Sequence, residues 1–150
     1  HGGRVSRMVD ILAAARRSGE VARLVEAVPY ARSMGIAALT VEGELLGHLR
    51  FGEHLIGNPR LPALHGGVIS ALLESTAIFQ LMWETEAILL PKTITLTVDY
   101  LRSGAPADTH ARGVVTRQGR RVTNVRVEAW QGDRAAPIAT AHGIFLVMRA

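Results

Sequence analysis

The sequence GGVISALLESTAIFQLMW, residues 66–83, decides the fold. Its eighteen residues contain one ionisable side chain, Glu74, and are otherwise mostly apolar. A run of this length approaches what a helix needs to cross a bilayer. Glu74, Gln80 and three hydroxyl residues lie near its middle, however, and such groups are unfavourable in a lipid environment. We therefore expect a helix buried in a protein core.

Glu74 and the two glycines at the start of this segment point to chemistry. An ionised carboxylate on an apolar helix is unfavourable to bury unless it is paired, and buried carboxyl groups often work as acid, base or nucleophile. Gly66 and Gly67 would open the helix without bulky side chains. Backbone N–H groups at such a helix start can hold a developing oxyanion. One segment thus offers both an electrophilic pole and a carboxylate.

The composition indicates one folded domain. A chain of 150 residues with 48 % hydrophobic and 20 % charged residues can bury a substantial core. We divide it into an N-terminal helical segment, residues 1–34, and a main domain, residues 35–150. The absence of cysteine excludes disulfides, thiolate metal sites and a cysteine nucleophile. Since no uninterrupted signal-peptide core is present either, a cytoplasmic location is expected.

The charge of the chain favours an anionic ligand. Of its seventeen basic residues only Lys92 is a lysine, and the formal net charge is +4. The planar guanidinium fork binds phosphate through two hydrogen bonds, so a nucleotide phosphate is a suitable partner. Solvated surface charge is the alternative reading. Nucleic acid is not expected, because no aromatic residues are interleaved with the arginines to stack on bases.

The periodicity of the chain predicts an α+β fold. Apolar residues between positions 9 and 28 recur at helical spacing, with Gly19 as a break and Pro29 as the end of the run. Residues 36–42 and 45–51 predict a hairpin around Glu42-Gly43-Glu44. Four further strands are predicted at 92–101, 109–117, 121–131 and 136–148. In the first of these, one face should carry Ile94, Leu96, Val98 and Tyr100, and the other Thr93, Thr95, Thr97 and Asp99.

Four segments of the chain carry a family resemblance. They are HGGVISALLE at 65–74, VDYLR at 98–102, RQGR at 117–120 and ATAHGIF at 139–145. Together they resemble hotdog-fold thioesterases of the phenylacetate-pathway, PaaI-like group, over residues 36–147. The resemblance implies an antiparallel sheet wrapped around a long central helix. It also implies hydrolysis of an acyl-coenzyme A thioester by a homodimer, or by a tetramer built as a dimer of dimers.

The resemblance assigns catalytic roles to five positions. The backbone N–H of Gly66 would donate to the thioester carbonyl, and Glu74 would serve as nucleophile or as general base for water. His65 matches the histidine before that glycine, with a loop-locking hydrogen bond as its more ordinary role. Thr93 falls where relatives place a hydroxyl that holds water. Asn58 resembles a water-orienting asparagine, although its interval to His65 is one residue longer here.

The resemblance also assigns residues to the coenzyme A moiety. Gly67 would lie beside the substrate at the start of the helix. Arg117, Arg120 and Arg121 flank the turn at Gly119, and the corresponding loop in relatives lies near the coenzyme A phosphates. A solvated hairpin tip is the alternative for these arginines.

The spacing of Gly66 and Glu74 points to a shared site. Eight residues along one helix rise by about 12 Å, too far for both groups to reach one carbonyl. Two such helices packed antiparallel across a twofold axis would bring the start of one to the carboxylate of the other. The dimer is then required for catalysis, with two sites.

The sequence departs from the family pattern at two places. Many relatives have Asp where this chain has Glu74, and the aryl-specific branch that uses Glu often has a hydroxyl where this chain has Ile78. The choice between nucleophile and base therefore stays open.

Other functions remain as alternatives. A noncatalytic acyl-CoA-binding hotdog domain would keep the arginines and the apolar tunnel, and a hotdog hydratase or dehydratase would act on enoyl thioesters. No cofactor is expected, since coenzyme A is part of the substrate. No metal is expected either, because His48, His54 and His65 lack metal-ligand spacing, and the sequence has no G-x-S-x-G, G-x-G-x-x-G, Walker-type or H-E-x-x-H motif.

Overall fold

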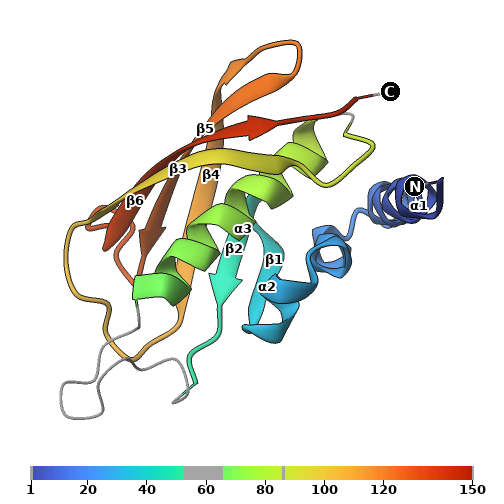
Figure 1. Cartoon of the computed structure of the whole chain (residues 1–150). Helices are drawn as coiled ribbons and strands as arrows, with labels where there is room; N and C mark the ends of the chain where they lie inside the picture. Colours follow the sequence, from blue (N-terminus) through green and yellow to red (C-terminus); the bar gives the residue numbers. More distant parts are fainter. Residues whose placement is uncertain (1, 53–65, 86, 150) are drawn as a thin grey trace.

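A six-stranded antiparallel sheet curves around one long helix, α3 (Gly66–Glu84), as Figure 1 shows. The computed structural model describes residues 2–52, 66–85 and 87–149. The spatial order of the strands is β1-β2-β4-β5-β6-β3. Their bounds are Ile36–Val41 for β1, Glu44–Leu49 for β2, Lys92–Tyr100 for β3, Thr109–Gln118 for β4, Val122–Trp130 for β5 and Ala139–Leu146 for β6. The predicted α+β hotdog architecture is confirmed.

Helix α3 forms the centre of the core. Its buried residues include Leu72, Leu73, Phe79 and Leu81, and it packs against the inner face of the sheet. Although its length and apolar composition would allow a membrane span, 61 % of the apolar window lies buried inside the protein, as expected of a core helix. The helix and sheet approach closely at Gly47, where an added Cβ would collide with the Thr76 hydroxyl.

The N-terminal segment is helical and lies on the β1 side of α3 (Figure 1). It consists of α1 (Gly2–Ser18), the 3-10 helix η1 (Val21–Ala27) and α2 (Pro29–Ser33). Gly19, with φ +70°, breaks the run as predicted. The run ends at Ala27, just before Pro29, as expected, but the short helix α2 that follows was not predicted. A proline lacks the N–H that a first helical turn leaves unpaired, so Pro29 also opens α2.

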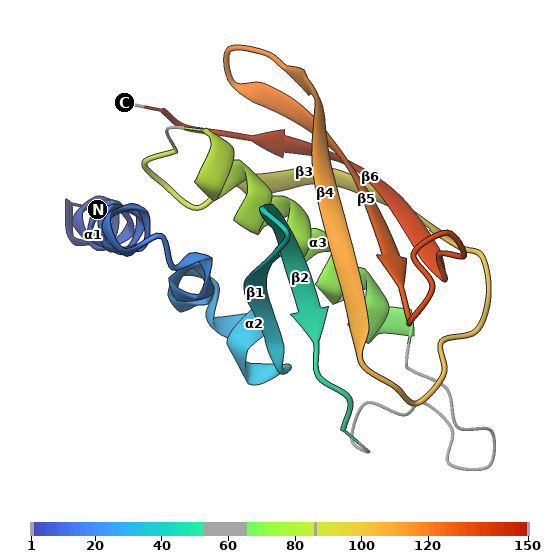
Figure 2. The same cartoon turned by 180° about the vertical axis from the view of Figure 1, so that it is seen from behind.

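The predicted β1–β2 hairpin turns at Glu42 and Gly43, which both have positive φ, 50° and 81°. Two successive residues of this kind match the twist of the strands they join. Seen from behind in Figure 2, β1 and β2 form one end of the curved sheet.

Strand β3 forms the other edge of the sheet. It pairs with β6 on one side, and the described residues place no strand on its other side. Its nine residues expose apolar side chains, among them Ile94 at 52 % and Tyr100 at 54 %. A long apolar edge of this kind favours pairing with another strand.

The guanidinium of Arg16 joins α1 to the end of α3. Its Nη2 donates to the carbonyl oxygens of Thr85 at 2.9 Å and Met82 at 3.3 Å. The last carbonyls of a helix lack intrahelical donors and carry partial negative charge, so a cation stabilises them.

We predict that Arg16→Ala lowers the free energy of unfolding, because the last carbonyls of α3 lose their donor. Since the contact is partly exposed, the loss should be only about 1 kcal/mol. Thermal or urea denaturation measures the change. Arg17→Ala is the matched control and should change stability less. Equal stabilities of the two variants would contradict the capping role.

Candidate active site

The carboxyl group of Glu74 is held from two sides. It lies in the middle of α3, half-buried, and both of its oxygens accept hydrogen bonds. The hydroxyl of Thr93 on β3 donates to Oε2 at 2.9 Å. The phenol of Tyr30 on α2 donates to Oε1 at 3.2 Å. Two hydroxyl donors stabilise and orient a carboxylate, which prepares it to act as a base or nucleophile.

Thr93 reaches Glu74 because β3 contains a bulge. The register of β3 against β6 shifts between Thr93 and Thr95, so Ile94 is an extra residue in the strand. One extra residue reverses which side chains face inward. The expected alternation was therefore wrong at this end of β3, where Ile94 points outward and Thr93 lies on the inner face.

Tyr30 is the site residue that sequence reasoning missed. It lies 44 residues from Glu74 along the chain, and only the packing of α2 against α3 brings them together. Burial is the largest cause that raises the pKa of Tyr30, to about 12, with the neighbouring Glu74 charge acting in the same direction and the Ser75 hydroxyl opposing it. The phenol therefore keeps its proton, and its capacity to donate, throughout the neutral range.

Gly66 begins α3 beside a surface pocket. Its carbonyl oxygen accepts a hydrogen bond from the Tyr100 hydroxyl at 2.9 Å, and Gly67 follows it in the helix. The pocket has a volume of about 330 Å³ and is lined by Gly66, Ile69, Tyr100, Leu101, Arg102, Ser103 and Gly104. The first N–H groups of a helix have no acceptor within the helix, so this end favours a carbonyl oxygen or anion.

A single chain does not bring Gly66 to Glu74. Both lie on one continuous helix, eight residues and about 12 Å apart. The other two catalytic candidates, His65 and Asn58, fall outside the described residues, so the structure places neither of them.

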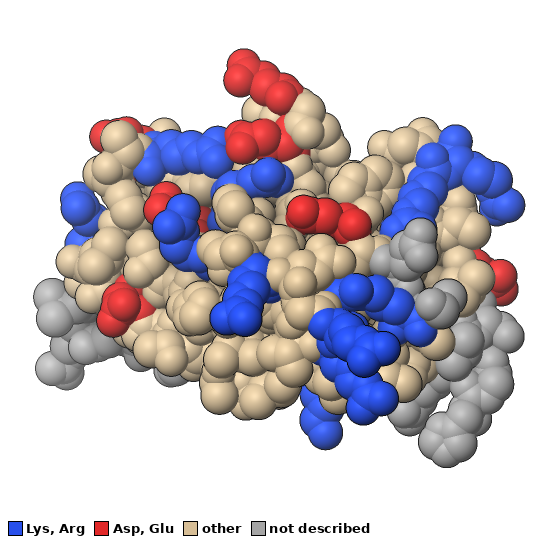
Figure 3. Space-filling view, turned by 90° about the horizontal axis from the view of Figure 1, so that it is seen from above, with Lys and Arg blue, Asp and Glu red and all other residues tan. Residues whose placement is uncertain are grey.

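The predicted arginine turn lies at the Thr93 end of the sheet. Gln118 pairs with Thr123, Thr123 with Phe145 and Phe145 with Thr93, so these four residues form one row across the sheet. The turn carrying Arg120 and Arg121 extends just beyond this row, and Arg117 lies at the end of β4. Figure 3 shows the molecule from above relative to Figure 1. Some basic side chains form one group on this face, and others are interspersed with acidic side chains.

Close packing shapes this turn at Gly119. Its N–H donates to the Val122 oxygen at 2.9 Å, and an added Cβ would lie 2.8 Å from that same oxygen. Arg149 Nη2 donates to the Gly119 oxygen at 2.9 Å. Arg149 was not anticipated, and it adds a further basic side chain to the turn.

His48 and His110 form a separate cluster with Asp108 outside this site. Gly47 contacts α3, so the next residue in the strand, His48, faces the outer side of the sheet. His48 Nε2 lies 2.9 Å from Asp108 Oδ2, and the His48 ring stacks on His110 at 4.7 Å. The N–H of Phe51 is the main cause that lowers the pKa of Asp108, and burial lowers the pKa of His110. Among the described residues no group has the arrangement of a metal site.

Comparison with known proteins identifies related chains. The family described as acyl-CoA thioesterase N-terminal domain matches residues 58–146. A crystal structure of a Chromobacterium violaceum protein is 38 % identical, covers 91 % of this chain and 96 % of its own, and superposes with a TM-score of 0.73. A search of curated proteins found no match.

Two more distant structures share the fold. A Bacillus halodurans protein solved with CoA is 22 % identical, with 99 % of this chain and 93 % of that one covered and a TM-score of 0.70. The PaaI protein of the E. coli phenylacetic acid degradation operon is 18 % identical, with 94 % and 98 % covered and a TM-score of 0.70.

We predict that one tyrosine of the wild type releases its proton only near pH 12, and that Tyr30→Phe removes this step. Tyrosinate absorbance during alkaline titration measures it. The stability that protonated Tyr30 contributes is present below its ordinary pKa of 10.0 and is lost as pH rises through about 12. Tyr100→Phe is the control and should keep the late step. A late step that survives in Tyr30→Phe would contradict the assignment.

Proposed function

The chain belongs to the acyl-CoA thioesterase N-terminal domain family, and from this membership we propose that it hydrolyses an acyl- or aryl-CoA thioester. In the net reaction one water molecule is consumed, the C–S bond breaks, and the products are a carboxylic acid and the thiol of coenzyme A. The reaction requires no cofactor. The observation that carries the proposal is the Glu74 carboxyl group, oriented by the hydroxyls of Tyr30 and Thr93.

Glu74 would act in one of two ways. As a nucleophile it attacks the carbonyl carbon, the C–S bond breaks and the coenzyme A thiolate leaves, and water then hydrolyses the mixed anhydride that remains. As a general base it removes a proton from water while that water attacks the carbonyl. The hydrogen bond from Thr93 is compatible with both roles of Glu74, because a hydroxyl can donate to the carboxylate and at the same time accept from a water molecule.

We propose that the oxyanion donor comes from a second chain. Thr93 at one end of β3 holds Glu74, and Tyr100 at the other end holds Gly66. If two copies pair antiparallel along their β3 edges, the Thr93 end of one strand lies beside the Tyr100 end of the other. The partner subunit's Gly66 then approaches Glu74. The exposed apolar edge of β3 supports this arrangement.

The arginine turn would hold the coenzyme A phosphates. Arg117, Arg120 and Arg121 offer guanidinium forks on the Thr93 end of the sheet, where the thioester would lie. A protein with the same fold was solved with CoA, which supports this ligand class.

We predict that Glu74→Gln lowers kcat for the best acyl-CoA by about 100-fold or more, because the amide neither takes a proton nor attacks a carbonyl. A thiol-release assay against an acyl-CoA panel measures it. Glu84→Gln, at the end of the same helix, is the matched control and should retain activity. If kcat of the Glu74→Gln variant were undiminished, the assignment of Glu74 as the reacting group would be contradicted. If the wild type binds acyl-CoA without releasing thiol, the noncatalytic alternative holds.

We predict that two inactive variants restore activity when mixed. Gly66→Pro removes one N–H at a position where a helix tolerates proline, and Glu74→Ala removes the carboxyl group. A site shared between subunits leaves one intact site in each mixed dimer, so refolding an equal mixture should recover about one quarter of wild-type activity. A site within one chain would recover none, and that result would overturn the proposed dimer mechanism.

A further inference from the structure

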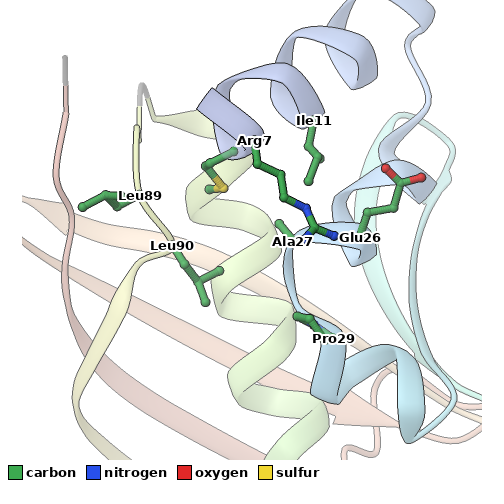
Figure 4. A pocket seen from close by; sticks show the side chains of 8 residues that line it. Arg7, Ile11, Glu26, Ala27, Pro29, Leu89 and Leu90 are labelled. Carbon is green, nitrogen blue, oxygen red and sulfur yellow. The ribbon is translucent and has the colours of Figure 1, made fainter. Parts of the chain in front are cut away.

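A second pocket lies between the N-terminal segment and the chain that leads into β3. Its volume is about 320 Å³, and Figure 4 shows its lining. Most of the lining side chains are apolar and come from α1, η1, the start of α2 and residues 89–90: Met8, Ile11, Ala27, Pro29, Leu89 and Leu90. We propose, resting on the function proposed above, that this pocket receives the acyl group of the thioester.

Two residues that line the pocket lie close along the chain to the two side chains that hold Glu74. Pro29 is followed directly by Tyr30, whose phenol donates to Glu74 Oε1. Leu90 precedes by three residues Thr93, whose hydroxyl donates to Oε2. Three residues of extended chain span at most about 10 Å. If the thioester carbonyl lies at Glu74, a short acyl chain attached to it can therefore extend into this pocket.

The chemistry of the lining selects the part of the substrate that fits. An apolar lining disfavours the phosphates and amides of coenzyme A, whereas each methylene buried there increases affinity about fourfold. Binding pockets for small molecules usually have volumes of about 300–1,000 Å³. A volume near the lower end of that range suits a short or medium acyl group or a single aromatic ring.

Two charged side chains border the pocket. Arg7 extends from α1 toward Ala27, and Glu26 lies on the neighbouring η1, as Figure 4 shows. Because their charges are opposite, the border carries no net charge. The pocket therefore favours an uncharged acyl group over one that ends in a carboxylate.

Most of the pocket belongs to the N-terminal segment. Only Leu89 and Leu90 lie within residues 58–146, the stretch that carries the family match. The core of the domain would supply the reacting groups, and the first thirty residues would set the preference for the acyl group.

The test fills the pocket from two walls. Ile11→Trp and Leu90→Trp each place an indole in the cavity, and Val9→Trp, on the same helix at a position 43 % exposed, is the control. We expect both pocket variants to lower the ratio of kcat/KM for octanoyl-CoA to that for acetyl-CoA at least tenfold, because only the longer acyl chain fills the pocket. Val9→Trp should leave the whole profile unchanged. An unshifted chain-length profile in both pocket variants would overturn the proposal.

A binding measurement separates this proposal from the proposed function. S-octyl-CoA is a thioether that cannot be hydrolysed, and titration calorimetry compares its affinity with that of CoA. We expect the octyl chain to increase affinity at least tenfold, and Ile11→Trp to abolish this increase while Val9→Trp keeps it. No increase, or one that survives in both pocket variants, overturns the pocket assignment. If the wild type hydrolyses no acyl-CoA, the proposed function fails, and the binding result still decides what the pocket accepts.

Discussion

A carboxyl group on a buried helix is stable only if its oxygens find hydrogen-bond donors, and this constraint organises the molecule around Glu74. The donors come from opposite sides of α3, Tyr30 from α2 and Thr93 from β3. Satisfying the carboxyl group therefore requires the N-terminal segment to pack against the core. It also requires the edge strand to lie alongside the helix. The carboxyl group of Glu74, the candidate reacting group, therefore also links α3 to α2 and to β3.

Much of the fold could be predicted from periodicity. The six strands follow from alternating apolar residues, the central helix from a long apolar run, and the turns at Gly43 and Gly119 from glycines where the chain reverses. Alternation does not say which strands become neighbours, so it could not place β3 at an edge. It also counts residues in twos, and the extra residue Ile94 breaks that count.

The site was predictable only where chemistry is local or where family motifs carry it. Glu74 stands out because it is a lone charge in an apolar run, and Thr93 was assigned by resemblance. Tyr30 gives no such signal, because its role depends on a tertiary contact across 44 residues. Arg149 likewise gains its meaning from the carbonyl of Gly119, which only the folded chain brings near.

The bulge at Ile94 makes the pairing register of β3 as important as its composition. If the same residues of β3 paired in strict alternation without the bulge, the hydroxyl of Thr93 would turn away from Glu74, with every amino acid of the site still encoded. The register of the hydrogen bonds between β3 and β6 therefore determines which side chain of β3 reaches Glu74. A homologue that keeps this inner-facing hydroxyl must either retain the extra residue or lose it entirely, because strict pairing of all nine residues of β3 would turn Ile94 inward in place of Thr93.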